Sequence, residues 1–572
     1  MMNPNRATST LLGIGWIAAS SSCSSSFSDN GGPGSSEAAI SGGVSSTSLA
    51  GDPFQTPLPI PPVLAATSRD ASTDYYEIAI RKGLTQMRAG ALTPIVGFNG
   101  IAPGPTIVAT RGRTVQVTQS NDWIENLSIH NHGHKVAASS DGHPTDYIAP
   151  GHSKVYTYPN DQNAGTYWYH DHTMDLTGPH VYRGLAAFYI IKDPAEDALR
   201  LPAGAYDIPL LIQDKSFNSD NSLAYEPNVL LGLLGDTAVV NGAATPYLDV
   251  GTRKYRFRLL NGSNARPLAV QLRINGSSTA KAFQVIASDA GLLQAPVELT
   301  TLLIAPAERY DIVVDFSQFP VGTQLDFINI NPGFAGAGWG GPNGAGWGGP
   351  NGAGWGGPSG AGWGGPNDAG WGGPNGAGWG GANDAGWGGA SGGDWADAEG
   401  ADWEGVGVVP ALTELLQFVV ARSESDPSVV PTRLANVQRF EPGDALGTKA
   451  IVFRLDGADW TINDLMYDPA RVDVRSQLDQ VYIWSLTNES PIPHPFHKHL
   501  SPFNILDING QAPPSFMNGW KDTVMVPPGS TVRIIFKEQT FSGTYVFHCH
   551  ILEHEDHGMM LQEKVTEKGV EP

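Results

Sequence analysis

The feature that most constrains the fold is a segment that occurs near both ends of the chain. In the first copy, Ile148-Ala-Pro-Gly151 leads to Gly165-Thr-Tyr-Trp-Tyr-His-Asp-His172. In the second, Val526-Pro-Pro-Gly529 leads, at the same internal spacing, to Gly543-Thr-Tyr-Val-Phe-His-Cys-His550. A third copy of the opening, Ile304-Ala-Pro-Ala307, precedes an expected strand over 310–316 but no histidine follows it. This repetition predicts three related domains, of which the middle one lacks histidine ligands.

The local pattern within these domains is typical of β-structure. We expect strands over 75–80, 106–109 and 114–118, and in the last of these Val115 and Val117 alternate with polar residues. Proline and glycine interrupt the pattern about every ten residues, and the chain contains 70 Gly and 43 Pro but only 16% charged residues. The sequence therefore predicts an all-β protein built from sandwiches or barrels.

A glycine- and tryptophan-rich octapeptide repeat, GAGWGGPN and its variants, separates the second domain from the third. We expect domains over 69–200, 201–330 and 409–572, with the repeat as an insertion over 331–408. The insertion has too much Gly and Pro for a helix and too few aliphatic residues for a core. It is either a surface insertion or an aromatic brush that binds a surface, a polymer or an aromatic reductant.

The N-terminus resembles an export signal, because an apolar run over 11–19 is too short to span a bilayer. We expect a signal peptide over 1–22 and a flexible linker over 23–68. Two outcomes remain open: cleavage near Ala19 would release the protein, whereas cleavage before Cys23 with lipidation of its thiol would tether it to a membrane. Either outcome predicts export to the bacterial cell envelope, as a periplasmic protein or an outer-membrane lipoprotein, or secretion.

The net charge and the cysteine count exclude one class of partner and one role for Cys549. A formal charge of −22 argues against a nucleic-acid partner, because no basic face is available to neutralise phosphates. Cys23 and Cys549 are the only two cysteines, and Cys23 belongs to the export signal. Cys549 therefore has no disulfide partner and is free for chemistry.

Histidines are concentrated in four His-x-His pairs, and none occurs between His180 and His494. Residues i and i+2 of a strand point to the same face, so each pair presents two imidazoles in one direction. Convergence of so many neutral imidazoles predicts metal ligation, and imidazole is a preferred ligand of copper. The pairs are His130/His132, His170/His172, His497/His499 and His548/His550.

A second metal site follows from the position of Cys549 between His548 and His550. Its thiolate points to the opposite face of the strand from the two imidazoles. His554 and Met559 follow it, and His494 precedes the third histidine pair. Two imidazoles, one thiolate and a weak thioether form the ligand set of a blue-copper electron-transfer site.

The motifs His494-Pro-Phe-His-Lys-His499 and His548-Cys-His-Ile-Leu-Glu-His-Glu-Asp-His-Gly-Met559 resemble the signature of the multicopper oxidases. The branch they resemble most contains bacterial spore-coat laccase, bilirubin oxidase and phenoxazinone synthase. The resemblance covers about 69–330 and 409–566. It implies three cupredoxin-like Greek-key domains and four coppers that reduce dioxygen to water by four electrons.

The resemblance also implies a role for each ligand. It assigns His494, Cys549, His554 and Met559 to the type 1 copper, and His130 and His497 to the type 2 copper. It assigns the type 3 pair to His132, His170, His172, His499, His548 and His550. Two carboxylates, Asp141 and Glu555, match positions beside the cluster, where each is either a proton relay or a charge balancer.

Three functions are compatible with these residues. The first is a laccase-like oxidase that takes single electrons from phenols, aromatic amines or tetrapyrroles. The second is a metal oxidase that acts on Cu(I), Mn(II) or Fe(II), although the chain has only 9 Met. The third is a non-catalytic envelope protein that kept the cupredoxin scaffold. For either oxidase the partners are dioxygen and the reductant, and we expect a monomer.

Overall fold

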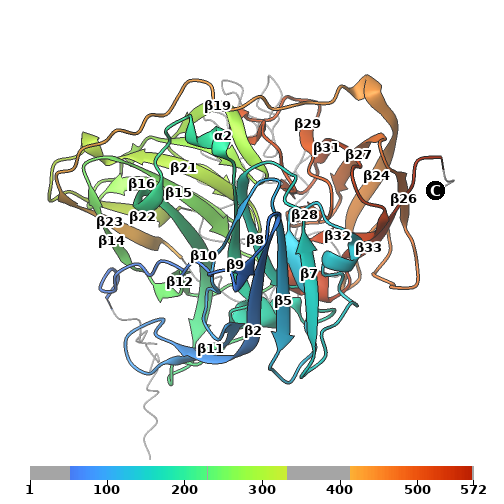
Figure 1. Ribbon diagram of the computed structural model, residues 1–572, viewed down its shortest axis with the longest axis horizontal. Coiled ribbons are helices and arrows are strands. Elements are labelled where there is room, and N and C mark those ends of the chain that lie inside the picture. The colour runs from blue at the N-terminus through green and yellow to red at the C-terminus, as the bar shows by residue number, and fades with distance from the viewer. Residues whose placement is uncertain (1–51, 229, 331–411, 570–572) are drawn as a thin grey trace, which may run out of the picture. The chain divides into compact units, whose positions relative to one another are not determined.

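The computed structural model describes residues 52–228, 230–330 and 412–569. The predicted signal peptide, Cys23, the first part of the predicted linker and the repeat insertion over 331–408 lie outside these residues. Nearly all of the regular secondary structure of the described residues lies in six β-sheets, which confirms the all-β, three-domain cupredoxin-like fold (Figure 1). The helices within the described ranges are at most seven residues long, so none of them could cross a membrane.

The first domain consists of two sheets and two short helices. One sheet contains β1 (Ser68–Arg69), β2 (Thr73–Thr85), β3 (Thr93–Phe98), β5 (Thr114–Asn121) and β7 (Ser153–Tyr158). The other contains β4 (Ile107–Thr110), β6 (Ile129–His132), β8 (Gly165–Asp171) and β9 (Ala186–Lys192). The helices are α1 (Thr177–Arg183) and the short α2 (Pro194–Asp197).

The second domain has the largest sheets. Its first sheet contains β10 (Asp207–Phe217), β11 (Leu223–Ala224), β12 (Thr237–Val240), β13 (Ala243–Ala244), β15 (Lys254–Asn261), β18 (Phe283–Ser288), β19 (Gly291–Leu299) and β21 (Arg309–Asp315). Its second sheet contains β14 (Tyr247–Gly251), β16 (Leu268–Ile274), β17 (Ala280–Lys281), β20 (Leu302–Ile304), β22 (Gln324–Asn329) and β23 (Glu414–Arg422).

The third domain again has two sheets. One contains β24 (Ala445–Asp456), β25 (Asp459–Ile462), β27 (Val481–Asn488), β29 (Asn504–Ile508) and β31 (Thr531–Lys537). The other contains β26 (Val474–Gln477), β28 (His494–Lys498), β30 (Thr523–Val526), β32 (Gly543–Cys549) and β33 (Met560–Thr566). The helix α3 (Leu552–Asp556) follows β32 directly.

The three domains share one strand arrangement. In each, a parallel pair is extended by an antiparallel strand, as β2-β5-β7, β10-β15-β21 and β24-β27-β31. The turn before the last of these strands has a positive φ at the corresponding position, which is 76° at Gly151, 69° at Ala307 and 69° at Gly529. Glycine is the residue that adopts this conformation without strain, so the first and third copies keep it and the middle copy tolerates alanine.

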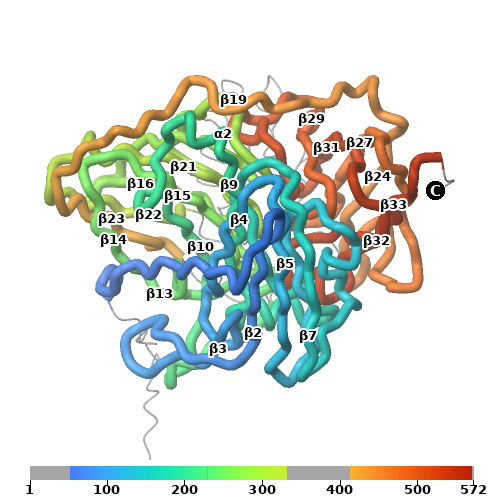
Figure 2. Tube along the Cα trace, viewed as in Figure 1, coloured from blue at the N-terminus to red at the C-terminus, as the bar shows by residue number. Residues whose placement is uncertain are grey.

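The predicted start of the third domain does not agree with the strand pairing. Residue 409 was expected to begin the third domain, yet β23 pairs with β14 and β22 of the second domain. The insertion therefore joins two antiparallel neighbours of one sheet. Segment 423–444, orange in Figures 1 and 2, then leads from β23 to β24.

The last part of the predicted flexible linker has fixed partners. The amide of Leu58 donates to the carbonyl of Tyr247 (2.7 Å), and the amide of Leu64 donates to the carbonyl of Thr106 (2.8 Å). Leu58 is buried in the core of the second domain. Residues 52–67 thus bind both the first and the second domain, because their proline-rich sequence suits an extended strand-like path.

Candidate metal centre

The four histidine pairs lie at the ends of four strands that pair two by two. In the first domain His130 on β6 lies directly opposite His170 on β8. In the third domain His497 on β28 lies opposite His548 on β32. The second member of each pair follows two residues later and points to the same side of its sheet. Each domain thus presents four imidazoles on one edge.

The two sets of imidazoles meet between the first and third domains. The ring of His130 stacks on that of His499 with a centroid distance of 3.8 Å, and His132 stacks on His497 at 3.6 Å. All eight rings are buried. The structure therefore brings together the eight histidines that the sequence singled out.

Most of the ring nitrogens that face the centre of this cluster have no hydrogen-bond partner among the described residues. A buried nitrogen without a hydrogen bond costs about 1–3 kcal/mol, so several such atoms in one place indicate a bound cation. Nε2 of His172 and Nε2 of His548 lie 3.2 Å apart within the same group. The unpartnered atoms are Nε2 of His130, His170, His497, His499 and His550, and Nδ1 of His132 and His550.

In most of these histidines the opposite ring nitrogen is held by a fixed acceptor, whereas neither nitrogen of His550 has a hydrogen-bond partner in the described part of the chain. Such a hydrogen bond fixes the tautomer, so the lone pair of the inner nitrogen faces the cluster. Burial holds the pKa of His130 and His497 well below the usual value, so these rings stay neutral as ligands. Four Nδ1 atoms donate to the carbonyls of Asp141 (from His130, 2.6 Å), Asp171 (from His170, 2.8 Å), Asp522 (from His497, 2.8 Å) and Cys549 (from His548, 3.0 Å).

The two carboxylates predicted beside the cluster both contact it. Asp141 accepts a hydrogen bond at Oδ2 from Nδ1 of His499 (2.7 Å). The oxygens of Glu555 lie 3.1 Å from Nδ1 of His172 and 3.1 Å from Nδ1 of His548. Burial raises the pKa of Asp141, whereas for Glu555 the contacts with the two histidines outweigh burial and hold its pKa well below the usual range.

Cys549 faces away from this cluster toward a second group of ligand atoms. Its Sγ lies 3.3 Å from Nδ1 of His494 and 3.8 Å from Nδ1 of His554. Met559 is fully buried in the same core, and its carbonyl accepts a hydrogen bond from the amide of Cys549 (3.1 Å). Burial raises the pKa of the Cys549 thiol, so a thiolate forms here only with a metal cation beside it.

The comparisons with known proteins agree with this geometry. Three family models described as multicopper oxidase match residues 79–196, 207–329 and 445–569. A laccase of Bacillus subtilis (strain 168) is 30% identical, with 90% of this chain and 98% of the relative covered. The chain belongs to the multicopper oxidases.

Other similar proteins come from the same family. A bilirubin oxidase of Albifimbria verrucaria is 32% identical, with 90% of this chain and 81% of the relative covered. The crystal structure of a laccase from Pediococcus acidilactici superimposes with a TM-score of 0.72 at 28% identity, covering 90% of this chain and 94% of that one. This multicopper oxidase is therefore a copper-dependent oxidoreductase that uses dioxygen, and its imidazole, thiolate and thioether donors fit copper.

The sequence did not reveal a buried ion-pair network beneath the cluster. Asp522 lies 3.1 Å from Nε2 of His132 and accepts a hydrogen bond from Nη1 of Arg309 (2.6 Å). Asp289 accepts hydrogen bonds from the backbone amides of Asp522 (3.1 Å) and Thr523 (3.2 Å). Asp522 thereby turns Nδ1 of His132 toward the cluster, and the contact joins all three domains at this point.

The sequence indicated His554 and Glu555 as site residues, but it did not predict that they lie on a helix, α3. Glu553, beside His554, accepts hydrogen bonds from the amide of Leu233 (3.0 Å) and the side chain of Asn264 (2.8 Å). Asp556 accepts a hydrogen bond from the backbone amide of Thr177 at the start of α1 (2.8 Å). Successive residues of α3 thus attach it to the second domain, to Cys549 and to the first domain.

Proposed function

We propose that this multicopper oxidase is laccase-like and couples one-electron oxidation of phenols, aromatic amines or tetrapyrroles to four-electron reduction of dioxygen to water. One observation carries the proposal: eight inward-facing imidazoles and a separate thiolate group are joined through Cys549. His548 and His550 flank this cysteine in the chain, so a short covalent path connects the two groups.

We assign four coppers to these groups. His494, Cys549, His554 and Met559 would hold the type 1 copper, and His130 and His497 the type 2 copper. The proximity of His172, His499 and His548 supports one type 3 site, and His132, His170 and His550 would hold the other. Bound in these positions, copper supplies the one-electron redox steps that join oxidation of the reductant to reduction of dioxygen.

The carboxylates beside the cluster have the geometry to deliver protons. Oδ1 of Asp141 is buried and accepts no hydrogen bond from any described residue, so it can hold a proton at that oxygen. Glu555 is ionised, and its two oxygens contact Nδ1 of His172 and Nδ1 of His548, so it can accept a proton and pass it on. Thr177 donates to Oε1 of Glu555 (2.7 Å), which fixes the orientation of the carboxylate. We therefore assign both residues a proton-relay role in the formation of water.

The apolar loop of Leu230, Leu231 and Leu233, which covers His554, favours organic reductants over metal ions. His554 is fully buried, and its Nε2 donates to the carbonyl of Leu230 (3.0 Å). Leu231 and Leu233 of the same loop are buried, and Leu230 packs against the core around Cys549. An apolar surface of this kind binds an aromatic ring, whereas a metal ion needs oxygen or sulfur ligands.

Oxygen uptake by the copper-loaded protein tests the proposal. We expect uptake with a phenol and with bilirubin, slower uptake with Cu(I) or Mn(II), and none with the Cys549→Ser variant. If oxygen uptake occurs only with Mn(II) or Cu(I) and not with the organic reductants, the protein is a metal oxidase and the proposed organic substrates are wrong. A fully copper-loaded protein that is inactive with every reductant would support the non-catalytic scaffold.

We also propose that the protein is exported, on the strength of the apolar run over 11–19. Lipidation of Cys23 and a monomeric state belong to the same proposal. The intact mass of the mature protein distinguishes a lipidated N-terminal Cys23 from cleavage near Ala19, and light scattering gives the oligomeric state. An N-terminus that still begins at Met1 in the mature protein would contradict export by this signal.

A further inference from the structure

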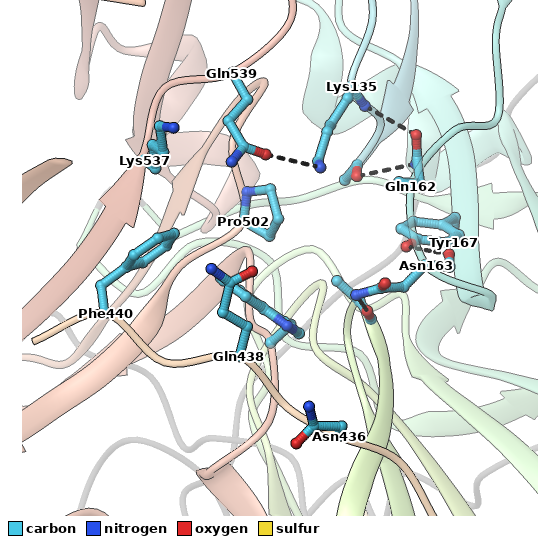
Figure 3. Close-up of a pocket in the computed structure, with 13 residues that line it drawn as sticks. Lys135, Gln162, Asn163, Tyr167, Asn436, Gln438, Phe440, Pro502, Lys537 and Gln539 are labelled. Carbon is cyan, nitrogen blue, oxygen red and sulfur yellow. Dashed lines mark hydrogen bonds between the residues drawn. The ribbon is translucent and has the colours of Figure 1, made fainter. Parts of the chain in front are cut away.

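A polar pocket with a volume of about 190 Å³ lies where segments of all three domains meet. Figure 3 shows it between strands of the first domain on one side and of the third domain on the other. None of the proposed copper ligands lines it. Its lining consists of Gly133, Lys135, Gln162, Asn163, Tyr167, Ala290, Asn436, Gln438, Phe440, Pro502, Trp520, Lys537 and Gln539.

The charge of the pocket is opposite to that of the chain as a whole. Two lysines and no carboxylate line it, although the formal net charge is −22. Lys537 is paired with Asp479 at 3.3 Å, and the Asp479 side chain is largely exposed. Lys135 forms no ion pair with any described residue, and its Nζ has one long hydrogen bond, to Oε1 of Gln539 (3.5 Å).

The unpaired ammonium of Lys135 lies in a partly dehydrated position. Burial lowers its pKa, and Asp161, the carboxylate that opposes this effect, forms no ion pair with it. An unpaired cation in such a position is costly, and an anion placed beside it would restore the lost interaction. The pocket therefore provides one strong point of attraction for a single negative charge.

The remaining lining suits a flat aromatic group with polar edges. Phe440 and Trp520 pack at a centroid distance of 6.0 Å in an edge-to-face arrangement. Amide side chains supply neutral donors, among them Gln438 and Gln539 (Figure 3). The volume is below the ~300–1,000 Å³ of pockets for drug-sized ligands, so a single ring fits better than a larger molecule.

We propose that this pocket binds a small aromatic carboxylate, with its ring against Phe440 and Trp520 and its carboxylate on Lys135. The site lies apart from the copper ligands and goes beyond the proposed oxidase activity. It also has a structural link to the metal centre. Gly133 forms part of its wall and follows His132 in the chain, and a Cβ at Gly133 would come within 2.3 Å of Asp522.

Thermal unfolding of the copper-loaded full-length protein with benzoate tests the site. Benzoate has no phenolic hydroxyl group, so binding is separated from oxidation. We expect benzoate to raise the unfolding temperature in a saturable manner and benzamide, its neutral analogue, to have no effect. Lys135→Met should weaken benzoate binding on the order of tenfold, because a charge-assisted hydrogen bond is lost.

Lys281→Met is the matched control, because Lys281 lies on β17 of the second domain and does not line the pocket; this variant should bind benzoate like the wild type. Inorganic phosphate, an anion without an aromatic ring, tests whether the pocket requires the ring as well as the negative charge. A shift with phosphate equal to that with benzoate would overturn the aromatic part of the proposal. Equal shifts with benzoate and benzamide, or full benzoate binding by Lys135→Met, would overturn the site itself.

Discussion

Asp522→Asn removes the negative charge that lies between Arg309 of the second domain and His132 of the histidine cluster. Asp522 and Arg309 are both buried, with side-chain exposures of 2% and 0%. The carboxylate accepts hydrogen bonds from Nη1 and Nη2 of Arg309 and also contacts Nε2 of His132 (3.1 Å). Asparagine keeps one acceptor oxygen, so one guanidinium N–H group loses its partner and the positive charge loses its counter-ion.

The expected cost follows from the burial of this pair. Removing one partner of a buried ion pair costs about 3–5 kcal/mol, because the other charge is left uncompensated. Asp289 lies 3.8 Å from Arg309 and offsets part of this cost, so we expect a value near the lower limit. The loss is a large part of the ~5–15 kcal/mol that stabilises a folded protein. Copper affinity should fall by about 10–100-fold, because Asp522 orients His132.

Urea unfolding of the copper-free protein measures this cost without the contribution of bound metal. Asp507→Asn is the matched control, since Asp507 forms a similar pair with Arg533, whose side chain is 44% exposed. Because solvent screens such an exposed ion pair, it contributes about 0–1 kcal/mol to stability. If Asp522→Asn destabilises the protein no more than Asp507→Asn does, the ion pair beneath the cluster does not have the role assigned to it.

Three further predictions concern pH dependence, proton delivery and the reductant. Burial lowers the pKa of Lys215 to about 7 from 10.5, so the unfolded state binds more protons between these values. The free energy of unfolding should therefore rise with pH by up to ~1.4 kcal/mol per unit between pH 7 and 10.5, and Lys215→Met should lose this rise; an unchanged slope in urea titrations would refute it. Glu555→Gln should slow reoxidation by dioxygen about 10²-fold in stopped-flow experiments while reduction of the type 1 copper keeps its rate, and equal slowing of both steps would exclude a proton-relay role. Leu230→Glu should lower kcat/KM for phenols relative to Mn(II), whereas Leu84→Glu, on an exposed position of β2, should leave the ratio unchanged; equal ratios in both variants would remove the apolar cover from the account.

The grouping of the proposed ligands could be predicted from the sequence, because the geometry of short segments determines where they lie. Strand periodicity puts His548 and His550 on one face and Cys549 on the other, and both groups fall within one short motif. The repeated openings at Gly151 and Gly529 indicated which domains carry ligands. These signals depend on neighbouring residues, and short-range geometry is what a single sequence encodes most directly.

The remaining features depend on contacts between distant segments. Arg309 and Asp522 are 213 positions apart, and neither belongs to a motif with a metal-ligand spacing. Leu230 covers His554 across a separation of 324 residues. Residues 52–67 were included in the predicted linker over 23–68, and their extended, proline-rich sequence carries no local signal of the contacts that they make. Only the folded chain shows that these residues have partners.

Copper content and visible absorption of wild type and Cys549→Ser test the central claim most directly. We predict four coppers per chain and an intense blue colour for the wild type. Cys549→Ser should remain folded, keep three coppers at the histidine cluster and lose the colour, because its thiolate is the ligand of the type 1 site. A fully copper-loaded wild type without colour, or a Cys549→Ser variant that keeps both the colour and four coppers, would contradict the assignment of the two sites.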